Sequence, residues 1–306
     1  MSALSGHVED YLRLRRALGF KLERAGQLLP QLVAYLEAAG AATITSELAI
    51  GWARRPERAQ PNHWAQRLAI ARGFARYLQT IDPATEVPPP GVFPSRRHRP
   101  APYLWSASGI CRLLEGARAL RPPLRAATHE TLFGLFAASG MRLGEAIGLQ
   151  RDDVDLVAGV IMIREAKFDR SRLVPLHPTT TEALRRYAAE RDRLCPRPRS
   201  GAFFLSSVGT TLTRSGVDKT FREITIAIGV RTATVRPRVH DLRHSFAVDT
   251  LIRWYRSGVN LDVHIGALST SLGHVSPADT YWYLSAAPEL MALAADRLHS
   301  PFGAQR

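Results

Sequence analysis

The stretch Val239-His240-Asp241-Leu242-Arg243-His244-Ser245-Phe246 places an imidazole and a guanidinium three residues apart. Residues at this spacing share one face of a helix, and we predict such a helix near residues 241–256. His240 beside Arg243 suits transfer of a proton next to a group that neutralises negative charge. We interpret His244 as structural or solvent-facing. An HxxR pair alone is common in proteins, so its meaning depends on the residues to either side.

Upstream, the stretch Ala138-Ser139-Gly140-Met141-Arg142-Leu143-Gly144-Glu145 predicts a helix that ends at a glycine and a second helix that begins near Arg142. The start of a helix presents free backbone N–H groups and a positive dipole end, which favour a phosphate. Arg142 would add a bidentate guanidinium, and Glu145 would hold that guanidinium in place. A surface Arg–Glu pair is the alternative that these residues alone leave open.

Between these two stretches, Lys167 falls at the predicted turn of a hairpin within Arg164–Leu176. Only three of the chain's 41 basic Lys and Arg residues are lysine, the others being Lys21 and Lys219, so a lysine here is unusual. Arginine stays protonated, whereas lysine can release its proton. A site that must protonate a leaving oxygen would therefore need Lys167. A solvated turn lysine is the alternative.

Downstream, Gly273-His274 is followed by Tyr283 nine residues after the histidine. Ser276 suits the N-cap of a helix and Pro277 its first turn, and this helix would project Tyr283 about two turns further on. A lone tyrosine on a helix is usually a packing residue, and Tyr281 is a second tyrosine two residues earlier.

In chain order, these residues resemble the active-site series of the tyrosine recombinase (phage integrase) family, and of its Xer-like and mobile-element members. The series comprises Arg142, Lys167, His240-x-x-Arg243, Gly273-His274 and Tyr283. The local contexts are similar as well: residues 138–149 resemble the motif of the first arginine, Arg172–Leu176 the Arg-x-Val-Pro-Leu pattern that ends the hairpin, and residues 240–247 the second motif.

The resemblance covers residues 105–285, and the spacing from His274 favours Tyr283 over Tyr281 as the family's tyrosine. The segment from Arg243 to His274 is longer than in simple Xer-type members, which leaves its helix boundaries open. The catalytic residues themselves match the family's pattern.

The fold that the resemblance implies is mainly α with a small antiparallel β-sheet (α+β), in two domains. Residues 1–82, with apolar residues at helical spacing, would form a helical, SAM-like core-binding domain. Residues 83–101, rich in proline and arginine, would be a linker. Residues 102–306 would form the catalytic domain, and the alternating apolar pattern of residues 153–176 predicts its sheet.

The chemistry that the resemblance implies is a cut-and-rejoin reaction through a 3′-phosphotyrosyl bond to Tyr283. Lys167 would be the general acid, and His240 would assist proton transfer. The phosphate would be contacted by Arg142, Arg243 and His274, with Glu145 supporting the arginines. Covalent catalysis needs no nucleotide, and we expect no cofactor or metal, since the sequence shows neither a phosphate-binding G-x-x-x-x-G-K-[ST] loop nor a clear acidic cluster.

The net charge of +14 favours a polyanionic partner, and we expect double-stranded DNA. The candidate DNA contacts are Arg72 and Arg76 on a predicted helix and Arg96, Arg97 and Arg99 in the predicted linker, although a solvated basic face is the alternative for each group. The sequence has no apolar run of membrane-spanning length and no signal-peptide pattern at its start. These features predict a cytoplasmic protein without a membrane or small-molecule partner.

The expected function is site-specific recombination of a mobile element, by integration, excision or transposition, in a homotetramer or a mixed recombinase tetramer on DNA. Two alternatives stay open. One is DNA relaxation in the manner of a type IB topoisomerase, which shares the chemistry, and the other is a DNA-binding accessory protein without strand exchange. The DNA target, and whether the C-terminal helix docks in cis or in trans, do not follow from the sequence.

Overall fold

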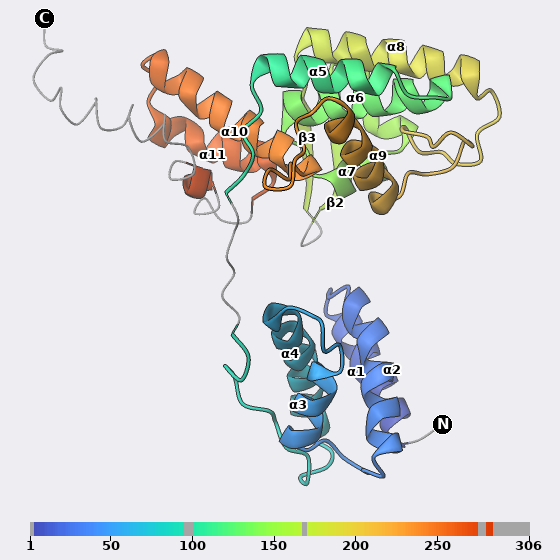
Figure 1. The fold of residues 1–306 in the computed structure, drawn as a ribbon, viewed down its shortest axis with the longest axis vertical. Coiled ribbons are helices and arrows are strands. Elements are labelled where there is room, and N and C mark those ends of the chain that lie inside the picture. Colours follow the sequence, from blue (N-terminus) through green and yellow to red (C-terminus); the bar gives the residue numbers. More distant parts are fainter. Residues whose placement is uncertain (1–2, 95–100, 167–169, 275–279, 284–306) are drawn as a thin grey trace, which may run out of the picture. The chain divides into compact units, whose positions relative to one another are not determined.

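The computed structural model describes residues 3–94, 101–166, 170–274 and 280–283 (Figure 1). The chain divides into two compact units, Met1–Pro100 and Ala101–Arg306. Each unit contains a hydrophobic core of its own.

The described part of the first unit is helical, as the apolar spacing of residues 1–82 predicts. Its helices are α1 (Ala3–Ala17), α2 (Glu23–Ala38), α3 (Ser46–Arg54) and α4 (Pro61–Leu78). Leu29, Leu32 and Leu36 of α2 are fully buried, because their spacing puts all three on the face that packs against the other helices. Trp52 and Phe74 are the large side chains of the same core.

The segment after α4 packs against this unit for longer than its prolines suggest. The predicted linker begins at residue 83, yet Thr85 and Phe93 are buried, and Glu86 N–H donates to the Ile44 carbonyl at 2.8 Å. Proline ends the helix because it lacks an N–H donor, but it does not stop the apolar residues between the prolines from packing. Extended chain therefore covers the first unit as far as Phe93.

The described part of the second unit consists of helices around a small sheet, so the predicted fold class is confirmed. Its helices are α5 (Ala107–Arg118), α6 (Pro123–Ser139), α7 (Leu143–Gly148), α8 (Pro178–Leu194), α9 (Arg214–Ala227), α10 (Val239–Arg256) and α11 (Leu261–Leu272). Helix α6 packs against α5, α8 and α10 (Figure 1). Its side chains Leu132, Phe133 and Phe136 lie in the middle of the core.

The sheet has three antiparallel strands in the order β1 (Val154–Asp155), β2 (Val160–Ala166) and β3 (Arg170–Pro175). Ile161 pairs with Val174, and Ile163 pairs with Arg172. Directly paired residues share a face of the sheet, and Ile161, Ile163 and Val174 are all buried. Leu173 points to the opposite face and is 59% exposed. The sheet therefore has one face on the core, and Arg172 belongs to that face.

Gly140 forms the turn that the sequence predicts between α6 and α7. Its φ of 62° is in the left-handed region, which ends the helix and which glycine adopts without strain. A Cβ at this position would lie 2.5 Å from Phe246 Cδ1 and 2.8 Å from Leu272 Cδ2. Glycine thus lets the ends of α6, α10 and α11 meet at one point, which is where the candidate site lies.

Among the described residues, no helix is both long and apolar enough to cross a bilayer.

Candidate active site

Arg142 lies at the start of α7, the position that the sequence predicts for it. It is the N-cap residue, and its backbone N–H donates to Glu145 Oε2 at 3.0 Å. One guanidinium nitrogen donates to Glu145 Oε1 at 2.8 Å, and another donates to the carbonyl of Gly273. The side chain of Arg142 keeps 34% of its surface exposed. Two nitrogens of the guanidinium are therefore hydrogen-bonded, and the group still reaches solvent.

Glu145 also binds a second arginine, Arg172 of β3, which the sequence assigns only to a motif and not to the site. Two nitrogens of Arg172 donate to the two carboxylate oxygens of Glu145 at 3.0 and 2.8 Å. Burial by itself would raise the pKa of Glu145, but hydrogen bonds from Arg172 and Arg142 outweigh burial and lower it. The carboxylate therefore stays ionised between two guanidinium groups.

Arg243 of α10 is the most deeply buried charge of the site, with 2% of its surface exposed. It donates to the Gly140 carbonyl at 2.7 Å and contacts His274 Nε2 at 2.8 Å. Burial lowers its pKa to about 10, although an interaction with Tyr283 acts in the opposite direction. Arg243 is still cationic at neutral pH, in surroundings where a positive charge is poorly solvated. An anion at this point would therefore be strongly attracted.

His240 lies one turn before Arg243 on α10, as its spacing predicts. Burial, followed by the positive charge of Arg243, lowers its pKa from 6.5 to about 4. The residue nevertheless presents accessible surface to solvent. The imidazole is neutral at pH 7, which is the form that can accept a proton.

The lowered pKa of His240 makes a testable prediction about His240→Gln. Because the wild-type imidazole stays neutral, the ratio of wild-type to variant cleavage rates should be constant between pH 8 and pH 6, and fall only in more acidic buffer. Single-turnover cleavage measured across this range tests the prediction. With the usual pKa of 6.5 the ratio would instead fall about fourfold between pH 8 and pH 6.

His274 and Tyr283 complete the cluster at the end of α11. His274 Nδ1 is 2.7 Å from Thr280 Oγ1, while its Nε2 faces Arg243. Because Arg243 can only donate, Nε2 accepts, and Nδ1 carries the proton that is donated to Thr280. The rings of His274 and Tyr283 are stacked at 6.0 Å with an interplanar angle of 18°. Tyr283 is 2% exposed and Tyr281 is 45% exposed, so Tyr283 is the tyrosine that faces the cluster.

His244 is part of the same cluster, which agrees with the structural rather than the solvent-facing role of the two that we predict for it. Its ring centroid lies 4.6 Å from that of His240 and 5.4 Å from that of Tyr283. His244 therefore sits between the two rings. Its position one helical turn after His240 was the available signal, because residues four apart share a helix face.

Several predicted site residues lie outside the described part of the chain. Lys167 is one, since the description of the hairpin stops at Ala166 and resumes at Arg170. The linker arginines Arg96, Arg97 and Arg99 are the others. The roles of all four stay predictions.

Arg72 and Arg76, the candidate DNA contacts on α4, have different surroundings. The Arg72 guanidinium donates to the carbonyls of Pro88 and Pro89, each at 2.7 Å. Arg76 is exposed. Arg72 thus holds the segment that follows α4. A phosphate would have to compete with the Pro88 and Pro89 carbonyls for its guanidinium.

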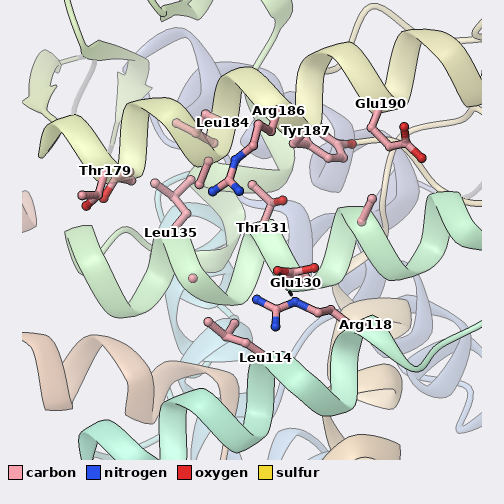
Figure 2. A pocket seen from close by; sticks show the side chains of 14 residues that line it. Leu114, Arg118, Glu130, Thr131, Leu135, Thr179, Leu184, Arg186, Tyr187 and Glu190 are labelled. Atoms are coloured by element: carbon pink, nitrogen blue, oxygen red, sulfur yellow. Dashed lines mark hydrogen bonds and ion pairs between the residues drawn. The ribbon is translucent and has the colours of Figure 1, made fainter.

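A cavity of about 430 Å³ between α5, α6 and α8 is separate from this cluster (Figure 2). Leu114, Leu135 and Leu184 line it, together with the ion pair of Arg118 and Glu130 at 2.7 Å. None of the predicted catalytic residues that the structure describes lines this cavity. Among the described residues, no group of three or more His, Cys, Asp or Glu side chains is placed to hold a metal ion.

The cluster as a whole combines guanidinium groups, a neutral imidazole and a buried phenol. Residues from four regions that are distant in sequence meet in it: the start of α7, strand β3, the first turns of α10, and His274 with Tyr283. Guanidinium groups neutralise phosphate oxygens bidentately, and a phenol oxygen can act as a nucleophile. The arrangement suits nucleophilic attack by a tyrosine on a phosphodiester.

Comparison with known proteins gives a consistent result. The model described as the phage integrase family matches residues 112–289. An integrase/recombinase of Sinorhizobium fredii is 45% identical over 306 residues, which cover 97% of this chain and 98% of that protein. The tyrosine recombinase XerC of Azotobacter vinelandii is 31% identical over 235 residues, which cover 77% of this chain and 73% of that protein.

Two solved structures share the fold. The Tn1549 transposon integrase in complex with circular intermediate DNA has a TM-score of 0.64 at 16% identity, and the match covers 95% of this chain and 99% of that chain. The XerH site-specific recombinase bound to a palindromic difH substrate has a TM-score of 0.59 at 18% identity, with 84% of this chain and 73% of that chain covered.

Proposed function

The chain belongs to the phage integrase family and is a tyrosine recombinase that acts in site-specific DNA recombination, and from this we propose that Tyr283 is the nucleophile that cuts and rejoins the DNA strand. The observation that carries the proposal is the position of Tyr283, which is buried against Arg243 and stacked on His274. Tyr281, by contrast, is 45% exposed.

In the proposed reaction the phenolic oxygen of Tyr283 attacks the phosphorus of a phosphodiester. The bond from phosphorus to the 5′-oxygen breaks, and Lys167 gives that oxygen a proton, so that a free 5′-hydroxyl leaves. The phosphate remains joined to the 3′-end of the DNA and to Tyr283. Attack by the 5′-hydroxyl of another strand reverses these steps, and no bond energy is lost to water.

Arg142 and Arg243 would bind the two non-bridging oxygens of the phosphate. Both guanidinium groups are already oriented by carbonyl oxygens, Arg142 by Gly273 and Arg243 by Gly140. Donors that are fixed before the reaction stabilise developing charge without reorganising. His240, which is neutral at pH 7, would take the phenolic proton. His274 would donate a hydrogen bond to the phosphate from Nε2 after that nitrogen has gained a proton, while Nδ1 stays bonded to Thr280.

We also propose that the DNA is double-stranded DNA of a mobile element, and that strand exchange takes place in a tetramer on two duplexes. The transposon integrase with the same fold, whose structure contains circular intermediate DNA, supports the first part. The net charge of +14 supports DNA as the partner. The helical first unit would be the core-binding domain, and Arg96, Arg97 and Arg99 would contact the DNA backbone.

Arg76, which is exposed, and Arg72, which is hydrogen-bonded within the first unit, offer a matched pair for testing DNA contact. Arg76→Gln should weaken DNA binding and reduce the slope of log affinity against log salt by about 0.9, the loss of one phosphate contact. Arg72→Gln should mainly lower the thermal midpoint, since it removes hydrogen bonds to Pro88 and Pro89. Fluorescence anisotropy at several salt concentrations, with a thermal scan of each variant, measures both. An unchanged slope for Arg76→Gln would remove this residue from the interface.

The proposed function is tested with nicked duplexes that tile the DNA flanking the gene. A nick beside the cleaved phosphate lets a short 5′-hydroxyl fragment diffuse away, so the protein should remain covalently bound to the DNA. A covalent adduct confined to particular duplexes supports site-specific cleavage. Relaxation of supercoiled plasmids that lack those sites would indicate a topoisomerase, and binding without any adduct would indicate an accessory protein.

A further inference from the structure

Arg172 is a charged residue on the core-facing side of β3, where the strand pattern calls for an apolar side chain. It pairs with Ile163 across the sheet and lies two residues from Val174, and these two neighbours are 3% and 1% exposed. The Arg172 side chain is 9% exposed. The apolar Leu173, by contrast, faces outward. A buried charge costs several kcal/mol unless it is paired, so its presence here requires an explanation.

The contacts of Arg172 join three elements of the second unit. Its two terminal nitrogens donate to Glu145 of α7 at 3.0 and 2.8 Å, and its Nε donates to the Ser271 carbonyl of α11 at 3.1 Å. Ser271 lies three residues before His274. One side chain therefore ties the sheet both to the helix that begins at Arg142 and to the backbone that leads into His274.

The way in which Glu145 is shared decides how Arg142 is held. Arg172 occupies both carboxylate oxygens, so the Arg142 guanidinium contacts only Oε1, at 2.8 Å, and directs another nitrogen to the Gly273 carbonyl. Without Arg172, Oε2 would keep only the Arg142 backbone N–H, at 3.0 Å, and the Arg142 guanidinium could reach this oxygen as well and form a bidentate pair with Glu145. A bidentate pair would turn the guanidinium toward Glu145 and occupy two of its donors.

Gly273 shows how closely the two guanidinium groups approach the same backbone. A Cβ at this position would lie 2.6 Å from Arg172 Cζ and 2.8 Å from the Arg142 guanidinium, and the φ of this residue is 66°. No side chain fits between the two arginines and this turn. The glycine before His274 is therefore part of the same arrangement.

We propose that Arg172 is a positioning residue for the cleavage reaction: by saturating Glu145 and holding the Ser271 carbonyl, it keeps Arg142 and His274 in the geometry that receives the phosphate. This inference rests on the proposed function, in which Arg142 binds the cleaved phosphate. Arg172 does not touch the phosphate itself. Its effect on the reaction passes through Arg142 and through the turn at Gly273.

The experiment compares Arg172→Met, Arg172→Lys and a control, Arg164→Met, on a nicked duplex that the intact protein cleaves. Arg164 of β2 forms an ion pair with Asp153, which is not a residue of the site, and the Arg164 side chain is 64% exposed. Arg172→Met should lower the single-turnover cleavage rate about 100-fold, the effect of a misplaced reactive group. It should leave the DNA dissociation constant within a few-fold of the intact protein. The cleavage rate of Arg172→Lys should lie between those of Arg172→Met and the intact protein, and Arg164→Met should cleave at the rate of the intact protein.

A second substrate separates positioning from a loss of folding. In a methylphosphonate, a neutral methyl group replaces one charged non-bridging oxygen of the cleaved phosphate, and the two diastereomers are tested separately. If Arg172 acts through Arg142, the defect of Arg172→Met should shrink at least tenfold on one diastereomer, because less charge needs to be neutralised. A general structural defect would be the same on both substrates, and that result would overturn the proposal even if the rate on normal DNA falls.

Arg142→Lys, measured alongside, shows which proposal has failed. If this variant cleaves at the rate of the intact protein, the proposed role of Arg142 is wrong and the role of Arg172 is overturned with it. If Arg142→Lys is impaired while Arg172→Met behaves like Arg164→Met, the proposed function stands and only the positioning role of Arg172 is overturned. A fall in the cleavage rate of Arg172→Met that becomes smaller on the methylphosphonate supports both the proposed function and the positioning role of Arg172.

Discussion

Tyr283→Phe is expected to abolish DNA cleavage, with a fall on the order of 10⁵-fold or more, to below detection. The substitution removes the oxygen that attacks phosphorus and leaves the ring in place. Tyr283 is 2% exposed, and its ring packs against those of His274 and His244. Phenylalanine preserves these ring contacts, so the variant should fold and bind DNA with an affinity close to that of the intact protein.

Tyr281→Phe is the matched control, because it makes the same chemical change two residues away on an exposed side chain. It should form the covalent adduct at the normal rate. The measurement is adduct formation on a nicked duplex by both variants, with anisotropy as the measure of DNA binding. Adduct formation by Tyr283→Phe, together with its loss in Tyr281→Phe, would move the nucleophile to Tyr281.

Arg243→Met is expected to lower the cleavage rate by about 10²- to 10³-fold, the usual effect of losing one fixed donor to a developing charge. Arg243 is nearly fully buried, and burial lowers its pKa to about 10. A cation in such surroundings interacts strongly with an anion and is poorly compensated without one. The charge of Arg243 therefore stabilises the complex with the phosphate more than it stabilises the DNA-free protein.

The stability of Arg243→Met distinguishes this role from a structural one. Replacing a buried charge by an apolar side chain of similar length removes the cost of keeping that charge away from water. The substitution also removes the hydrogen bond to the Gly140 carbonyl, which lowers the free energy of unfolding by about 1–3 kcal/mol if that oxygen stays unpaired. We expect a thermal midpoint within about 10 °C of the intact protein, with the full rate defect. Normal cleavage by the folded variant would contradict the proposed role of Arg243.

Much of the site could be predicted from the sequence because local spacing determines it. The glycine that ends α6 and the N-cap position of Arg142 follow from short-range rules, and so does the face shared by His240 and Arg243. The sheet followed from the alternation of residues 153–176. The order of the motifs then indicated that these local pieces belong to one site.

The remaining features depend on contacts between distant residues, which spacing alone does not contain. Arg172 faces the core because its partners, Glu145 and the Ser271 carbonyl, come from other elements of the fold. Arg72 lies on a helix face that suits DNA contact, yet the carbonyls of Pro88 and Pro89 occupy its guanidinium. His244 belongs to the cluster because the rings of Trp282 and Tyr283, distant in sequence, contact it.

The environment of His240 was also not predictable from its motif. The sequence predicts that it shares a helix face with Arg243, and this contact alone would lower its pKa. Burial is the larger cause of the shift to about 4, and burial is a property of the folded second unit. The sequence therefore indicated which residues could exchange protons, while the fold determines the pH range in which they can.

The most direct test of the central claim is to locate the tyrosine that becomes bonded to DNA. The adduct formed by the intact protein is digested with trypsin, which should release residues 257–297 as one peptide that contains both tyrosines. Tandem mass spectrometry of this peptide, after nuclease trimming of the DNA, places the phosphonucleotide on one residue. We predict that it lies on Tyr283. A phosphonucleotide on Tyr281, or on any residue outside this peptide, would contradict the account.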